Sequence, residues 1–177
     1  MILKKPFTVW LTGLSGAGKT TLAAGVQQLL GQEGIRAAVL DGDIVRKKLF
    51  PDLGFTKKDR ELNVKRIAHM ARLINDNGIP AIVSAISPYR SGRASARAVT
   101  REMLEIFVEC PPEICEKRDV KGLYRKARAG RIDNFTWVSD PYEEPDRPDL
   151  IVRTHKEAAD RCAERILELL TTRGYIK

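Results

Sequence analysis

The octapeptide GLSGAGKT at residues 13–20 decides the fold of this chain. It satisfies the pattern G-x-x-x-x-G-K-[ST], follows a short apolar run from Phe7 to Leu11, and precedes apolar residues at helical spacing from Thr20 to Leu30. Glycines let the backbone curl so that successive amides face one point, which the start of the helix also faces. The stretch therefore predicts a strand, a phosphate-binding loop and a helix.

The side chains of this loop predict what it binds. The ammonium of Lys19 suits the β- and γ-phosphates of ATP, and the hydroxyl of Thr20 suits Mg²⁺. The predicted ATP-binding set is Gly13, Leu14, Ser15, Gly16, Ala17, Gly18, Lys19, Thr20 and Thr21. A glycine-rich turn without a ligand is the alternative, but the strand before it and the helix after it favour the nucleotide.

Outward from the loop, short apolar runs alternate with helical patterns. Strands are predicted at 37–40, 81–86, 105–108 and 150–152, and helices at 59–77, 95–104 and 156–170. Such alternation is typical of βαβ units and a parallel sheet covered on both faces. We therefore expect one doubly wound α/β domain over residues 1–177, with a charged, Gly- and Pro-containing lid at about 117–148.

Composition excludes some classes and leaves others open. The 177 residues are 43% hydrophobic, contain no apolar stretch long enough for a membrane span, and carry a formal charge of +8. Three cysteines without C-x-x-C spacing predict reduced thiols in a cytoplasmic protein rather than a disulfide framework or a zinc site. The charge favours anionic partners, with nucleic acid and polyphosphate substrates both possible at this point.

Two carboxylates follow the second predicted strand in the sequence Asp41-Gly42-Asp43. Open α/β sheets bind their ligands at the carboxyl ends of their strands. Carboxylates there hold the water shell of magnesium or accept a proton from an attacking hydroxyl, so we assign the metal to Asp41 and the proton to Asp43. A plain turn or a helix cap is the alternative.

Six segments together resemble the adenylylsulfate (APS) kinases over nearly the whole chain. They are GLSGAGKTTLA from Gly13, LDGDIVRKKL from Leu40, DLGFTKKDRELNVKR from Asp52, ISPYR from Ile86, CEKRDVKGLYRKARAG from Cys115 and DPYEEP from Asp140. The resemblance implies transfer of the γ-phosphoryl group of ATP to the 3′-hydroxyl of adenosine 5′-phosphosulfate. The products would be 3′-phosphoadenylylsulfate (PAPS) and ADP, with Mg²⁺ required, in a homodimer that serves sulfate assimilation.

The resemblance also implies roles for individual residues. Arg46, Arg60 and Asn63 would bind the phosphosulfate and sugar of APS, while Phe55 and Phe135 would clamp its adenine. The remaining implied residues are Ile86 and Ser87 in the acceptor site, Lys121, Gly122 and Leu123 in the lid, and Arg118 at the adenine of ATP. For each, a solvated charge or a core position is the alternative. The predicted catalytic set is Lys19, Asp41, Asp43 and Ser87, with direct transfer and Ser87 as a binding residue.

The chain departs from the family pattern at three positions, and the one at Gly92, where a more polar or acidic residue is common, is minor. Val120 stands where proline is usual, and Trp137 stands where glycine is usual. Three other functions stay open on sequence grounds: a kinase for a sugar acid or a nucleoside monophosphate, a silent regulatory domain, and a basic protein that binds nucleic acid under nucleotide control. No helix-turn-helix, RNP or zinc pattern supports the last, and we expect neither nucleic acid nor membrane as a partner.

Overall fold

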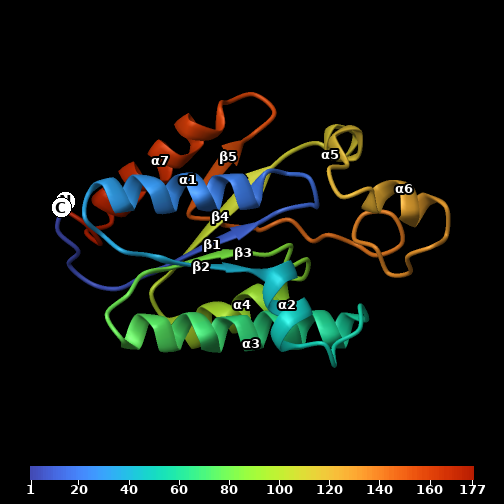
Figure 1. Ribbon diagram of the computed structural model, residues 1–177, viewed down its shortest axis with the longest axis horizontal. Helices are drawn as coiled ribbons and strands as arrows, with labels where there is room; N and C mark the ends of the chain where they lie inside the picture. The colour runs from blue at the N-terminus through green and yellow to red at the C-terminus, as the bar shows by residue number, and fades with distance from the viewer.

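A five-stranded parallel sheet lies between two layers of helices in the computed structural model, which describes residues 1–177 (Figure 1). The strands are β1 (Thr8–Thr12), β2 (Ala38–Asp41), β3 (Ala81–Ser84), β4 (Met103–Glu109) and β5 (Leu150–Arg153). Their order is β2-β3-β1-β4-β5, and every neighbouring pair is parallel. The α/β class predicted from the sequence is confirmed.

Helices cover both faces of the sheet. They are α1 (Lys19–Gln32), α2 (Gly42–Leu49), α3 (Lys57–Asp76), α4 (Arg90–Thr100), α5 (Pro112–Arg118), α6 (Leu123–Arg128) and α7 (Ala159–Thr172). Helices α1 and α7 pack together on one face, and α3 packs with α4 on the other (Figure 1). Helices α5 and α6 project beyond the end of the sheet that carries the glycine loop, where the lid was expected.

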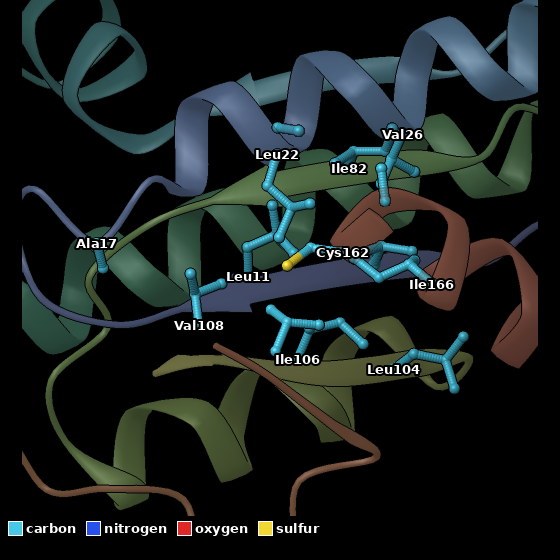
Figure 2. Close-up of a cluster of buried hydrophobic side chains, with 14 of the residues drawn as sticks. Leu11, Ala17, Leu22, Val26, Ile82, Leu104, Ile106, Val108, Cys162 and Ile166 are labelled. Atoms are coloured by element: carbon cyan, nitrogen blue, oxygen red, sulfur yellow. The ribbon is translucent and has the colours of Figure 1, made fainter. Parts of the chain in front are cut away.

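All five residues of the central strand β1 are buried, and its three inner residues, Val9, Trp10 and Leu11, are apolar. Leu11 faces a core that includes Leu22 and Val26 of α1 and Ile166 of α7 (Figure 2). Trp10 points the opposite way, into a smaller core that α3 and α4 cover. Two packed layers thus hold β1 rigidly, and the loop that follows β1 starts from a fixed position.

The predicted helix at 95–104 is wrong at both ends. Helix α4 begins at Arg90 and ends at Thr100, and Arg101 stops it with a positive φ of 64°. Met103 and Leu104 belong instead to β4, where they pair with β1. These two apolar residues continue the helical pattern by chance, but the sheet buries them more completely than the surface of a helix would.

The sequence pattern did not predict α2, α5 or α6. Asp41 starts α2 because its Oδ1 accepts hydrogen bonds from the backbone amides of Asp43 and Ile44, at 3.0 and 3.2 Å. The helix-cap interpretation of the Asp-Gly-Asp stretch is therefore confirmed. All three helices have eight residues or fewer, which is too short for a clear apolar period. No helix in the structure combines the length and the apolar character needed to cross a bilayer.

Candidate active site

Residues 13–18 form a glycine loop between β1 and α1, and two of its glycines are required by close approach. A Cβ on Gly13, whose φ is 152°, would lie 2.5 Å from the carbonyl oxygen of Val108. A Cβ on Gly16, whose φ is 78°, would lie 2.8 Å from the carbonyl oxygen of Cys115. Both obstacles are backbone atoms that cannot move aside. The loop is therefore wedged between β1, β4 and α5.

Lys19, the first residue of α1, lies inside this loop. Its Nζ donates hydrogen bonds to the carbonyl oxygens of Gly13 at 2.8 Å and Leu14 at 2.7 Å. Only 8% of the residue is exposed, and this burial lowers its pKa to about 8, partly offset by the nearby charge of Asp43. A phosphate group in the loop would give the buried ammonium of Lys19 the anionic partner that its two carbonyl contacts do not provide.

A cavity of about 740 Å³ opens over the loop. The predicted ATP-binding residues that line it are Ser15, Gly16, Gly18, Lys19, Thr20, Thr21 and Arg118. Gly13, Leu14 and Ala17 do not line it, since Leu14 and Ala17 are packed in the core. Arg118 at the end of α5 holds two separate segments, because its guanidinium donates to the carbonyl oxygens of Gly16 at 3.2 Å and Thr154 at 2.9 Å.

Oxygen ligands suitable for a hard cation converge beside Lys19. The Oγ1 of Thr20 donates to Asp41 Oδ2 at 2.9 Å and lies 3.5 Å from the hydroxyl of Ser84. No group of three or more His, Cys, Asp or Glu side chains is arranged to hold a metal. The site formed by Thr20 and Asp41 fits Mg²⁺, which takes one or two protein oxygens and completes its coordination shell with water and substrate phosphates. It does not fit a cage-bound transition metal.

A smaller cavity of about 90 Å³ adjoins the first. Ser15, Asp43, Ala85 and Ile86 line both cavities and form the shared wall. The residues implied for the acceptor gather in the smaller one: Arg46, Phe55, Arg60, Asn63, Ile86, Ser87, Leu123 and Phe135. Lys121 lines only the larger cavity, and Gly122 lines neither.

Two arginines and a phenylalanine form one end of the smaller cavity. The guanidinium of Arg46 lies 3.7 Å from the ring centre of half-exposed Phe55, and that of Arg60 lies 5.5 Å from it. Burial lowers the pKa of both guanidinium groups, and the charge of Arg60 adds to the effect on Arg46. Two partly desolvated cations side by side favour a ligand with two negative charges.

The other aromatic residue, Phe135, is anchored in the core. It is buried and meets the ring of Tyr124 edge-on, with centroids 5.0 Å apart and an interplanar angle of 77°. The core alternative left open by the sequence is thus correct for the packing of Phe135, although the residue also lines the cavity. Phe55, by contrast, contributes to neither core cluster.

Ser87 is buried and its hydroxyl is already bonded. The Oγ accepts a hydrogen bond from Trp10 Nε1 at 3.0 Å, and its nearest backbone acceptor, the carbonyl oxygen of Ala85, is 3.4 Å away. No histidine lines either cavity. A serine nucleophile requires a neighbouring base, so this geometry suits a residue that shapes the site.

The structure adds contacts that sequence reasoning missed. Lys121 of the lid donates to Asp43 Oδ2 at 2.5 Å, and this carboxylate raises the pKa of Lys121. Thr154 lines the larger cavity, where its Oγ1 donates to the carbonyl oxygen of Ala17 at 2.7 Å. Thr154 directly follows β5, and its place at the carboxyl edge of the sheet is the signal that could have found it. For Lys121 and Asp43, 78 residues apart, the sequence offers no such signal.

Comparison with known proteins gives this geometry a family. The family profile described as adenylylsulphate kinase matches residues 5–153. The chain belongs to the adenylylsulfate kinase family. The resemblance found in the sequence is thereby confirmed.

The similarity extends over almost the entire length of its relatives. The adenylyl-sulfate kinase of Halothermothrix orenii is 53% identical, and the match covers 98% of this chain and 94% of the relative. The adenylyl-sulfate kinase of Synechococcus sp. (strain JA-2-3B'a(2-13)) is 49% identical, and the match covers 98% of this chain and 99% of the relative. Among solved structures, the Mycobacterium tuberculosis APS kinase in complex with AMPPNP and APS superposes with a TM-score of 0.92 at 44% identity. That match covers 94% of this chain and 98% of the other.

Proposed function

We propose that this kinase transfers the γ-phosphoryl group of ATP to the 3′-hydroxyl of adenosine 5′-phosphosulfate, giving PAPS and ADP for sulfate assimilation. The observation that carries the proposal is the pair of adjoining cavities with a shared wall. One cavity contains the glycine loop and Lys19, and the other contains Arg46 and Arg60 beside two aromatic rings. In-line transfer needs the donor phosphate and the acceptor hydroxyl to meet, and the residues that line both cavities mark the place where the two sites adjoin.

The donor half binds ATP by backbone amides and one cation. The loop from Gly13 to Gly18 cradles the phosphates, and Lys19 neutralises the transferring group. Arg118 is assigned to the adenine of ATP. Thr20 and Asp41 would hold Mg²⁺, which supplies charge neutralisation at the phosphates when it is bound. Thr21, next to Thr20 on α1, also lines the larger cavity.

The acceptor half would recognise APS by charge and stacking. Arg46, Arg60 and Asn63 are assigned to its phosphosulfate and sugar, and its adenine is placed between Phe55 and Phe135. The lid residues Lys121, Gly122 and Leu123 would close over both nucleotides, with Ile86 and Ser87 as the opposite wall.

Asp43 is our candidate for the group that orients or deprotonates the 3′-hydroxyl. It lines both cavities, so it reaches the point where donor and acceptor meet. Its ion pair with Lys121 links the position of the lid to the state of this carboxylate. Transfer is direct, because the buried Ser87 hydroxyl has no base beside it.

The test is to incubate the purified protein with ATP, Mg²⁺ and APS and to measure PAPS and ADP. Lys19→Ala should abolish product, as should removal of Mg²⁺ by EDTA, whereas Lys65→Ala on the exposed surface of α3 should leave turnover unchanged. Gluconate and nucleoside monophosphates serve as competing acceptors. A higher kcat/KM with any of them, or no PAPS from the intact chain, would overturn the proposed acceptor.

The homodimer implied by the resemblance is a further prediction, which light scattering of the purified protein can test. We also propose that the protein acts in the cytoplasm. Its cysteines, Cys110, Cys115 and Cys162, are all buried and unpaired, as expected for a reducing compartment.

A further inference from the structure

One motif found in the sequence has no part in the function described so far, namely DPYEE at residues 140–144. In the structure this segment runs alongside residues 86–90, the acceptor wall and the start of α4. The amide of Glu143 donates to the carbonyl oxygen of Pro88 at 2.8 Å, and Glu143 Oε2 accepts from the amide of Arg90 at 2.8 Å. The hydroxyl of Tyr89 donates to Asp140 Oδ2 at 2.7 Å. The segment is thus fastened to this wall by main-chain and side-chain bonds.

Arg93 lies where three parts of the molecule meet. Its Nε donates to Glu105 Oε1 on β4, its Nη1 to the carbonyl oxygen of Ser87, and its Nη2 to that of Glu143, each at 2.7 Å. The residue is 3% exposed, so these bonds form in a low-dielectric setting where each is worth more than at the surface. One planar guanidinium therefore ties the acceptor wall and the 140–144 segment to the sheet.

The acceptor wall needs such support because its backbone is strained. Ser87 has a φ of 41°, which a residue with a side chain rarely adopts without external restraint. Next to it, the carbonyl oxygen of Ile86 accepts from Thr12 Oγ1 at 2.7 Å, and this hydroxyl lies 2.9 Å from the hydroxyl of Tyr142. The carbonyl oxygens of Ile86 and Ser87 are thus both bound by side chains, while Ile86 lines both cavities and Ser87 lines the smaller one.

The same segment reaches an arginine of the acceptor cavity. Asp140 Oδ2 lies 3.5 Å from Arg60 Nε, and both side chains are largely buried. The Arg60 guanidinium also donates to the carbonyl oxygens of Phe55 and Asn134. Asp140 therefore helps to fix the direction in which this guanidinium points.

We propose that residues 140–144 form a clasp that positions the acceptor site, and that Arg93 is the positioning residue that locks this clasp to Ser87. The proposal rests on the function proposed above. Arg93 itself lines neither cavity, so it acts through Ser87 and Glu143 and not by touching a substrate.

The competing explanation is that Arg93 serves only as the partner of the buried carboxylate Glu105. Arg97, one turn later on α4, provides a matched control for this role. Its Nη2 lies 3.6 Å from Glu105 Oε2 and 2.9 Å from Asp149 Oδ2, and its Nη1 donates to the carbonyl oxygen of Met103 at 2.8 Å. It belongs to the same charge network but makes no hydrogen bond to residues 86–90 or 140–144.

The experiment compares steady-state kinetics of Arg93→Lys and Arg97→Lys. A lysine at 93 keeps a cation near Glu105 but cannot reach the carbonyl oxygens of Ser87 and Glu143 together. For Arg93→Lys we expect KM for APS to rise about 10-fold while KM for ATP stays within about 2-fold, since only the acceptor wall loses its restraint. For Arg97→Lys both KM values should stay within about 2-fold of the parent. Calorimetric titration of APS into the ADP·Mg²⁺ complex should give the same ratio for binding.

Tyr142→Phe is a milder second variant, which deletes the hydroxyl next to Thr12 and keeps the ring stacked on Phe107. It should raise the KM for APS about 3-fold, and Tyr175→Phe, which deletes a hydroxyl bonded to Glu102 far from the site, should not. If Arg93→Lys does not fold, this pair decides the question.

Three outcomes would overturn the clasp: equal rises in both KM values, equal effects of Arg93→Lys and Arg97→Lys, or an unchanged KM for APS in Tyr142→Phe should Arg93→Lys not fold. Failure of the proposed function is distinct, because the unmodified chain would then form no PAPS at all.

Discussion

Lys19 should make nucleotide binding depend on pH around its own lowered pKa of about 8. Its ammonium is buried in the glycine loop with two carbonyl oxygens as its only hydrogen-bond partners, and desolvation lowers its pKa from 10.5 to about 8. The phosphates of ATP favour the charged form, so they should restore a higher pKa in the complex. Binding at alkaline pH must therefore take up a proton.

The magnitude follows from the pKa of the free protein. With a value of about 8, Lys19 is charged in roughly three quarters of molecules at pH 7.5 and in roughly 3% at pH 9.5. If only the charged form binds tightly, the Kd for ATP should rise about 25-fold between these two pH values. The Kd for ATP must rise with pH, and not fall, because raising the pH removes the proton that the bound state requires.

The assay is calorimetric titration of Mg²⁺-saturated ATP at pH 7.5, 8.5 and 9.5, in pairs of buffers with different ionisation enthalpies. The buffer dependence reports proton uptake, which should increase with pH and approach one proton per ATP at pH 9.5. Lys19→Met should bind weakly at every pH, without the pH dependence of the parent. A parent Kd that is constant from pH 7.5 to 9.5, with no proton uptake, would refute the reasoning.

Three further predictions concern the loop and the lid. Gly16→Ala should lower the free energy of unfolding, measured in urea, by about 2 kcal/mol and weaken ATP binding, because its Cβ would meet a backbone carbonyl. The control Gly31→Ala, in an open part of α1, should raise the free energy of unfolding by about 0.5 kcal/mol. Lys121→Met should change the free energy of unfolding by less than about 1 kcal/mol, because its ion pair with Asp43 is exposed. The same substitution should lower kcat at least 10-fold in the PAPS assay, and an unchanged kcat would contradict a role of Lys121 in lid closure. Trp137→Gly should raise the free energy of unfolding by about 1 kcal/mol. The residue has a φ of 80°, and the strain of a bulky residue there exceeds the entropic cost of glycine, so equal or lower stability of the variant would contradict this explanation.

The sequence predicted most of the fold because its signals are local. The order of strand, glycine loop and helix is contained within about 25 residues, and the buried strands are recognisable as short apolar runs. Errors occurred where local pattern and tertiary burial disagree. Met103 and Leu104 fit a helical period, but pairing with β1 makes them strand residues.

Recognition of the site was more uneven. Lys19 could be assigned from the glycine-loop motif, and Asp41 from its position at the end of a predicted strand. Arg46, Arg60 and Phe135 entered only through the resemblance, since nothing local distinguishes them from solvated charges or core rings. The structure brings all three to one cavity, and their individual roles stay predictions.

By itself, the amino-acid sequence determined the parallel sheet, the phosphate loop and the family, because each depends on spacing along the chain. Only the tertiary structure decided which distant residues meet: Lys121 with Asp43 across 78 positions, and Arg93 with Glu143 across 50. The physical reason is that a hydrogen bond between distant segments depends on where the packed sheet and helices bring them. No periodicity in the sequence encodes that distance.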